Sequence, residues 1–209
     1  MSGAREVILV HGLWMPAAVM APLAARLQSA GFRCHLFGYP SRGRPLDVHA
    51  ERLARFAGGI GRAHFVGHSL GGVLVLHALE RHRAIAAANV VLIGAPVRGN
   101  VAGRRLARHG WGRWMLGTTL ALWQDPGTAR WTRAEPLGVI AGSLSLGLGR
   151  LFGALPGAND GVVRVAETAV EGMRERIVLR VSHAAMLLSA RVALQAASFL
   201  RDARFAHPR

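Results

Sequence analysis

Residues 67–71, which read GHSLG and centre on Ser69, carry the residue types and spacing best suited to chemistry. Phe65 and Val66 precede them as a buried strand would, and an apolar helical pattern follows directly. This layout is typical of a nucleophile elbow, a tight strand-to-helix turn that exposes a serine hydroxyl. Glycine at 67 and 71 would avoid collisions at the crowded junction. The alternative is a plain glycine-rich turn between a strand and a helix.

A serine hydroxyl needs a base, and the base needs a carboxylate that orients it. In a fold with this turn the chain order is serine, acid, histidine. Asp47 precedes the serine, Asp125 precedes the fifth predicted strand, and Asp202 lies in the terminal helix. Asp160 remains as the acid, in a turn-rich loop beyond that strand, with Glu167 as a weaker substitute. Asn-Asp-Gly is also a good turn sequence in any protein, so a structural role is the alternative.

His183 is the expected base, because it directly follows the last predicted strand and precedes the final helix. Of the ten histidines, it alone stands at a strand end downstream of Asp160. His207 lies in the polar tail, too near the terminus to be held rigidly.

Backbone N–H groups should stabilise the negative charge of a tetrahedral intermediate. One donor follows from the elbow, the N–H of Leu70, and the loop after the first strand should supply the other, the N–H of Leu13. Each such donor contributes about 3 kcal/mol to lowering the barrier. His11 lies in the same loop before the serine, and we expect it to brace that loop.

Apolar strand-like runs alternate with helical patterns along the chain, which predicts an α/β fold. We expect a mainly parallel central sheet of about six strands with helices on both faces. The predicted strands cover 7–10, 32–37, 64–66, 89–93, 137–141 and 176–181. The predicted helices cover 16–30, 46–56, the segment after the serine, and 184–203.

The 209 residues fit one domain, 1–209, because no Pro/Gly/Ser-rich linker divides them. No apolar run reaches the roughly 18 to 20 residues that would cross a bilayer, so no transmembrane segment is expected. The first apolar segment is interrupted by His11, Gly12 and Pro16, unlike a secretory signal. The lone Cys34 forbids an internal disulfide. We therefore expect a cytoplasmic protein.

The formal net charge is +15, and all 26 basic residues are arginine. Most are scattered, and only Arg104, Arg105, Arg108 and Arg113 form a local group. A compositional bias explains this pattern more simply than a dedicated nucleic-acid surface, so no nucleic-acid partner is expected. Peripheral contact of this group with an anionic membrane or an acidic partner remains the alternative.

The interval 97–135 is irregular and holds four of the five tryptophans. Trp111 and Trp114 fall on one face of a helix with Met115, Thr118 and Leu122. One interpretation is a lid or an acyl-pocket insertion beside the serine, with Trp14, Trp111 and Trp114 lining the substrate pocket. The other is an ordinary core-facing helix.

Metal and cofactor chemistry have little support in the sequence. His77 and His82 are five residues apart, which places them about 140° apart around a helix and off any shared face. No glycine-rich phosphate loop follows a strand. We expect no cofactor and no metal.

Four segments, VHG at 10–12, GHSLGG at 67–72, NDG at 159–161 and Ser182-His183, together resemble the α/β-hydrolase superfamily. The chain looks like the compact bacterial lipase and esterase branch over essentially its whole length. The resemblance implies an α/β-hydrolase fold with a small cap or none, an open active site and acyl transfer to water. Trp14 stands where those lipases carry a second glycine, so the acyl pocket should differ. Serine at 69 argues against the dehalogenase and epoxide-hydrolase members, which use aspartate there.

Together these residues predict a serine hydrolase that cleaves carboxylic esters, from small molecules or lipids, through an acyl-enzyme on Ser69. An acyltransferase or an amidase would use the same triad, so both stay open. A non-catalytic protein with this fold, binding lipid or an acidic partner, is the third alternative. Acyl-chain length, natural substrate and oligomeric state stay open.

Overall fold

The structure is a computed structural model that describes residues 4–120, 129–146 and 154–206. Six strands form one parallel sheet in the order β2-β1-β3-β4-β5-β6. They are β1 (Glu6–Val10), β2 (Arg33–Phe37), β3 (Ala63–His68), β4 (Ala87–Ile93), β5 (Leu137–Gly142) and β6 (Glu175–Leu179). All six predicted strands are present, with ends shifted by two residues at most. The predicted α/β architecture is confirmed.

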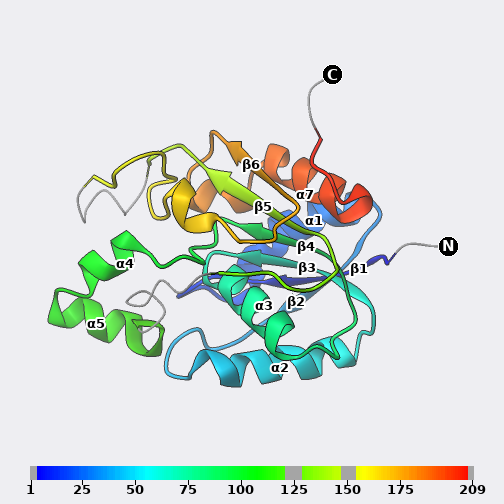
Figure 1. The fold of residues 1–209 in the computed structure, drawn as a ribbon, viewed down its shortest axis with the longest axis horizontal. Helices are drawn as coiled ribbons and strands as arrows, with labels where there is room; N and C mark the ends of the chain where they lie inside the picture. The colour runs from blue at the N-terminus through cyan, green and yellow to red at the C-terminus, as the bar shows by residue number, and fades with distance from the viewer. Residues whose placement is uncertain (1–3, 121–128, 147–153, 207–209) are drawn as a thin grey trace.

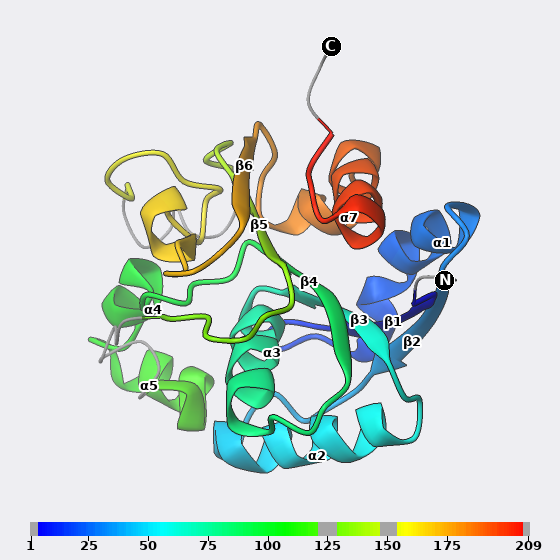
Figure 2. The same cartoon turned by 45° about the vertical axis from the view of Figure 1, so that its right-hand side comes forward.

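Helices cover both faces of the sheet. Figures 1 and 2 show α1 and α7 on one face, and α2 and α3 on the other. The helical elements are η1 (Ala17–Met20), α1 (Ala21–Ser29), α2 (Leu46–Gly58), α3 (Leu70–Arg81), α4 (Val101–Leu106), α5 (Gly110–Leu116), η2 (Gly117–Thr119), η4 (Val165–Thr168), η5 (Ala184–Leu187) and α7 (Ala190–Asp202). Within the described ranges, none of the helices combines the length and the apolar character needed to cross a membrane.

Successive side chains along a strand point to opposite faces of the sheet, and this alternation explains why the core has two layers. In β1, Val7 and Leu9 point into the layer under α1 and α7, whereas Ile8 and Val10 point into the layer under α2 and α3. All four side chains are fully buried, as expected for a parallel sheet covered on both faces.

The strand order fixes where a ligand can enter. The chain runs from β1 outward to β2, then returns to the other side of β1 to form β3. Loops that leave the carboxyl ends of β1 and β3 therefore diverge, and such a switch point opens a crevice in α/β sheets. The elbow serine and residues 11–13 directly follow the carboxyl ends of β3 and β1, where such a crevice is expected.

Two helix predictions are wrong in detail. The predicted helix over 184–203 is interrupted, because η5 ends at Leu187 and Ser189 begins α7 by accepting a hydrogen bond from the N–H of Val192 (3.3 Å). A capping serine offers the backbone an alternative to continued helix. The expected single helix through 111–122 is also broken, since α5 ends where Gly117 adopts a φ of 55°. Leu122 and Trp123 lie outside the described residues.

We expect Phe199→Ala to destabilise the fold by about 3–5 kcal/mol in urea unfolding, because it leaves a cavity in the layer under α7. Phe199 is fully buried, and its ring packs against Phe205 with centroids 4.8 Å apart. Leu194→Ala, on the same helix at an exposed position, is the matched control and should stay within about 0.5 kcal/mol of wild type. Equal losses from both variants would contradict the packing described.

Candidate active site

Ser69 occupies the sharp turn between β3 and α3. Its backbone has φ 54° and ψ −126°, a region that costs a residue with a side chain about 1–3 kcal/mol. The Ser69 N–H donates to the carbonyl oxygen of Ile93 at the end of β4 (2.9 Å), which ties the turn to the sheet. The side chain is half-buried, so the hydroxyl stays accessible.

The two elbow glycines avoid steric clashes that any side chain would cause, as expected. A Cβ added at Gly71 would lie 2.3 Å from the carbonyl oxygen of Val10, and one at Gly67 would lie 2.5 Å from the Cα of Gly72. Real Cβ atoms do not approach backbone this closely, so α3 can start against β1 only with glycine there.

The structure brings the side chains of Ser69, Asp160 and His183 into one hydrogen-bonded row. His183 Nδ1 lies 2.8 Å from Asp160 Oδ2, and His183 Nε2 lies 3.0 Å from Ser69 Oγ. A carboxylate only accepts, so Nδ1 carries the hydrogen and the Nε2 lone pair faces the serine hydroxyl. This is the tautomer that a base acting on Ser69 requires.

Backbone contacts hold Asp160 in its orientation. Its Oδ1 accepts from the N–H groups of Val162 (2.9 Å) and Val163 (2.7 Å), which leaves Oδ2 free for His183. The N–H of His183 also donates to the carbonyl oxygen of Asp160 (2.9 Å). Both side chains are buried, which strengthens their hydrogen bond relative to one in water.

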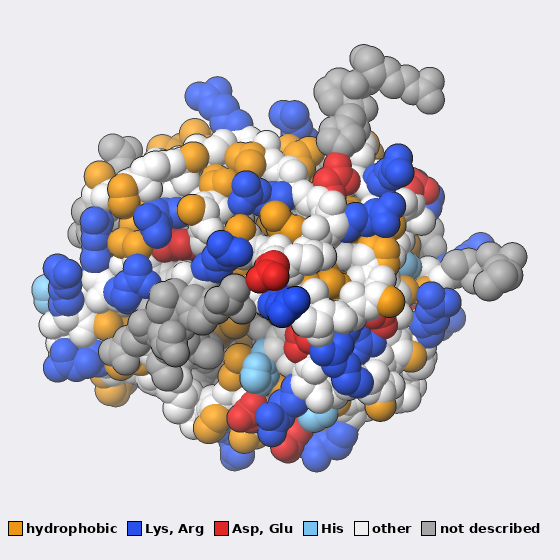
Figure 3. All heavy atoms as spheres, viewed as in Figure 1, with side chains coloured by type: hydrophobic (Ala, Val, Ile, Leu, Met, Phe, Trp, Pro, Cys, Tyr) orange, Lys and Arg blue, Asp and Glu red, His pale blue; other side chains and the backbone are white. Residues whose placement is uncertain are grey.

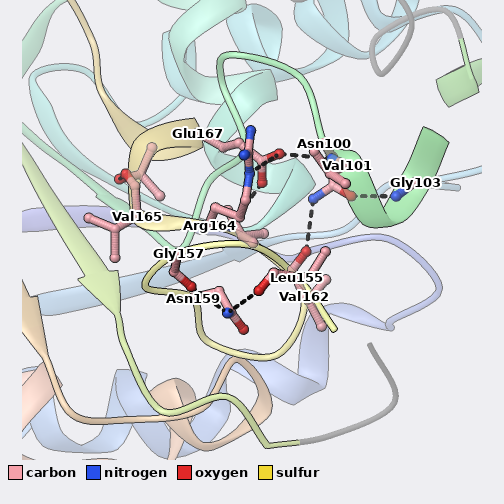
Figure 4. A network of polar contacts seen from close by, with 12 residues as sticks. Asn100, Val101, Gly103, Leu155, Gly157, Asn159, Val162, Arg164, Val165 and Glu167 are labelled. Carbon is pink, nitrogen blue, oxygen red and sulfur yellow. Dashed lines mark hydrogen bonds and ion pairs between the residues drawn. The ribbon is translucent and has the colours of Figure 1, made fainter. Parts of the chain in front are cut away.

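A second polar network supports the loop that carries the acid (Figure 4). Asn100 Nδ2 donates to the carbonyl oxygen of Val162 (3.1 Å), and Asn159 Nδ2 donates to that of Gly157 (2.8 Å). Glu167, the substitute acid considered from sequence, accepts from the N–H of Val101 and from Arg164. Its carboxylate therefore clamps this loop to the start of α4, while Asp160 is the acid at His183.

The loop after β1 lies directly against the serine. A Cβ on Gly12 would come within 3.0 Å of Ser69 Cβ, so the backbone leading into Leu13 passes over the turn. Leu70 is the first residue of α3, where no preceding helical turn supplies an acceptor for its N–H. An oxyanion hole formed by the N–H groups of Leu13 and Leu70 stays a prediction.

His11 braces this loop, as expected. The ring is buried and stacks on Tyr39 with centroids 4.5 Å apart. Its Nδ1 donates to the carbonyl oxygen of Gly12 (2.9 Å), and its Nε2 accepts from the N–H of Tyr39 (3.3 Å). The Tyr39 hydroxyl donates in return to the carbonyl oxygen of His11 (3.0 Å).

Sequence reasoning missed two contributors, His68 and Gly94. His68 is fully buried, and its Nε2–H donates to the carbonyl oxygen of His183 (3.3 Å). A Cβ on Gly94 would lie 3.3 Å from both Asp160 Oδ2 and His183 Nδ1, so glycine leaves room for that pair. The sequence signals that could have found them are the position of His68 directly before the serine and the position of Gly94 directly after β4.

The tryptophans near the site are largely exposed. Trp14, Trp111 and Trp114 expose 49%, 54% and 69% of their surface, so the core-facing alternative is wrong for Trp111 and Trp114. Trp14 has a φ of 60°, and its Nε1–H donates to the carbonyl oxygen of Met115 in α5 (3.0 Å). A pocket role for these rings stays a prediction.

The chain belongs to the alpha/beta hydrolase family, whose sequence profile matches residues 7–207. Solved structures share its fold at low identity. The mature form of Bacillus licheniformis lipase BlEst2 is 17% identical with a TM-score of 0.76, over 98% of this chain and 94% of that one. A pyrethroid hydrolase from Sphingobium faniae JZ-2 is 16% identical with a TM-score of 0.65, over 96% and 98%.

The metagenomic carboxyl esterase MGS0156 is 18% identical with a TM-score of 0.67, over 96% of this chain and 76% of that one. No curated protein matches the chain significantly by sequence. Identities this low establish a shared fold, so the chemistry must be argued from the residues of this site.

We expect the free energy of unfolding to fall as the pH drops below about 6.5. Burial lowers the pKa of His11 and His64, and it lowers the pKa of His68 to about 3. The unfolded chain then binds more protons than the folded one between pH 6.5 and these lower values, so acid favours unfolding.

Urea unfolding across pH 7.5 to 5 measures this loss. Each histidine that stays neutral in the folded state contributes a slope of up to about 1.4 kcal/mol per pH unit below pH 6.5. His68→Phe should therefore reduce the slope by about that amount. Stability that is constant over this range would show that these histidines are not buried and neutral.

Proposed function

We propose that the chain is a serine hydrolase that cleaves carboxylic esters, with Ser69 as nucleophile, His183 as base and Asp160 as orienting acid. The observation that carries the proposal is the hydrogen-bonded row from Asp160 Oδ2 through His183 to Ser69 Oγ. Membership of a hydrolase family and the lipase and esterase among its structural neighbours support the same class of reaction.

In this mechanism the Ser69 oxygen attacks the ester carbonyl carbon while its proton moves to His183 Nε2. The Asp160 carboxylate stabilises the imidazolium that forms. Collapse of the tetrahedral intermediate breaks the bond to the alcohol, which leaves with the proton from Nε2. Water then attacks the acyl-enzyme with the same base, and the carboxylic acid departs as Ser69 regains its proton.

The N–H groups of Leu13 and Leu70 would bind the oxyanion of each tetrahedral intermediate. Their support is the close approach of Gly12 to Ser69 and the place of Leu70 at the start of α3. Both donors belong to the backbone, so they are fixed before substrate arrives, which is the condition for effective transition-state stabilisation.

Acyl transfer to an acceptor other than water would use the same three residues and remains an alternative. Amide cleavage by the same residues also remains an alternative. Comparing the turnover of an ester and an amide that share one acyl group would distinguish the two activities. Trp14 is the aromatic side chain nearest in sequence to the oxyanion loop, and we keep it as a pocket residue. The cytoplasmic location expected from the sequence stays a prediction.

A fluorophosphonate probe should label the wild-type protein and fail to label Ser69→Ala, because only an activated serine attacks phosphorus at a useful rate. Gel fluorescence after labelling measures this. Ser198→Ala is the matched control, since that hydroxyl lies in α7 and donates to the carbonyl oxygen of Arg204. Equal labelling of Ser69→Ala and wild type would reject the assignment.

Asp160→Asn should lower kcat for a p-nitrophenyl ester roughly a thousandfold or more, because the amide favours the wrong imidazole tautomer and removes the charge that stabilises imidazolium. A circular dichroism melt should show that the variant folds. Asp202→Asn, at the exposed end of α7, should keep wild-type turnover. Turnover that survives in Asp160→Asn would reopen Glu167 as the acid.

A further inference from the structure

One end of the molecule carries a surface of arginines and exposed tryptophans, which we call the cationic face. Figure 3 shows blue spheres at the end where α4 and α5 lie in Figure 1, and also elsewhere on the same view. Its members come from α4, α5, the turn between these helices, and the loops after β1 and β2. They are Trp14, Arg42, Arg104, Arg108, Trp111, Arg113 and Trp114.

The charge of this face is not balanced by acids in the segments that build it. Neither 7–46 nor 81–124 contains an aspartate or a glutamate. Glu167 touches the start of α4, but its carboxylate is buried and paired with Arg164. Several acids elsewhere pair with arginine or histidine, as Asp47 does with Arg81 and His77. The two segments that build the face therefore contribute basic residues and no acidic ones, and Asp125 is the first acid after the second of them in the sequence.

Contacts join part of this face, Trp14 and Arg42, to α5. The Arg42 guanidinium lies 4.5 Å from the centroid of the Trp114 ring and donates to the Trp114 carbonyl oxygen (2.9 Å). Trp14 reaches the same helix through its bond to Met115. Tryptophan combines an apolar body with a polar N–H, which suits the boundary between lipid headgroups and acyl chains.

The cationic face is coupled to the elbow by packing. Leu106 of α4 and Leu116 of α5 are buried against Leu70, the residue that follows the nucleophile. α5, which carries Trp111 and Trp114, and α4 thus both pack against the residue next to the nucleophile. A surface that this face contacts would lie on the side of the molecule where these helices meet the elbow.

We propose that the cationic face docks on an anionic lipid surface and presents Ser69 to ester substrates held at that surface. Arginines supply attraction to anionic headgroups, and the tryptophans supply apolar area that a purely electrostatic partner would not use. Docking is argued from the residues of the cationic face alone, whereas the presentation of ester substrates rests on the proposed hydrolase function.

Co-sedimentation of the full chain with vesicles tests the docking. Wild type should bind phosphatidylglycerol vesicles, bind phosphatidylcholine vesicles far less, and be released by salt. Arg108→Gln/Arg113→Gln should weaken binding to phosphatidylglycerol roughly twentyfold, at about fivefold for each arginine lost near an anionic surface. Trp114→Ala should weaken it several-fold, because the ring no longer inserts.

The matched control is Arg174→Gln/Arg191→Gln, which removes the same charge from exposed positions before β6 and in α7. It should bind as wild type does. Equal loss in the control would mean that net charge alone matters and would overturn the proposal. Binding that needs the arginines but ignores Trp114→Ala would indicate a soluble polyanion partner and would overturn it as well.

Ser69→Ala separates this proposal from the proposed function. It should bind phosphatidylglycerol vesicles as wild type does while hydrolysing no ester. Failure of wild type to hydrolyse any ester, with vesicle binding intact, would overturn the hydrolase alone. Failure to bind vesicles, with hydrolysis of a water-soluble p-nitrophenyl ester intact, would overturn the docking alone.

Discussion

The hydrogen bond between His183 and Asp160 is the contact on which the candidate site depends. It joins two loops that leave neighbouring strands, and a second bond, from the His183 N–H to the Asp160 carbonyl oxygen, fixes their spacing. A buried carboxylate is costly unless hydrogen bonds satisfy it. Here two backbone N–H groups and the imidazole of His183 donate to the Asp160 carboxylate. Because the carboxylate holds Nδ1 of the imidazole, Nε2 on the other side of the ring faces Ser69.

The elbow stores strain that the rest of the fold must offset. Ser69 stays at a positive φ because β3 and β4 hold its N-terminal side, while α3 packs its first turn against the end of β1. The same packing brings the Gly12 backbone to the serine. Ser69 and the loop after β1 are therefore placed by one set of contacts, and His68 extends that set to the loop of His183.

Charge in this chain is distributed unevenly, in a way that composition alone does not explain. A coding bias can account for arginine in place of lysine. It does not account for the placement of acids, which serve as structural partners, as Glu135 does for the buried guanidinium of Arg133. Segments 7–46 and 81–124, which carry the cationic face, contain no acidic residue, unlike the segment in which this ion pair lies.

Local sequence determined much of this protein. Alternating apolar runs specified the six strands, and the GHSLG turn, Asp160 and His183 could be placed at strand ends, because the periodicity of strands and the steric needs of tight turns are short-range properties. Helix breaks at Gly117 and Leu188 were missed, since a glycine at positive φ or a capping serine can end a helix within a continuous apolar pattern.

Tertiary structure decided what those residues do together. Only the fold shows that Asp160, and not Glu167, reaches the imidazole, because both acids lie in one loop and its course is set by the Asn100 and Asn159 contacts. Burial of His68 against His183 and exposure of Trp111 and Trp114 also depend on distant neighbours. Convergence of residues far apart in the chain is a property of packing, which no local pattern encodes.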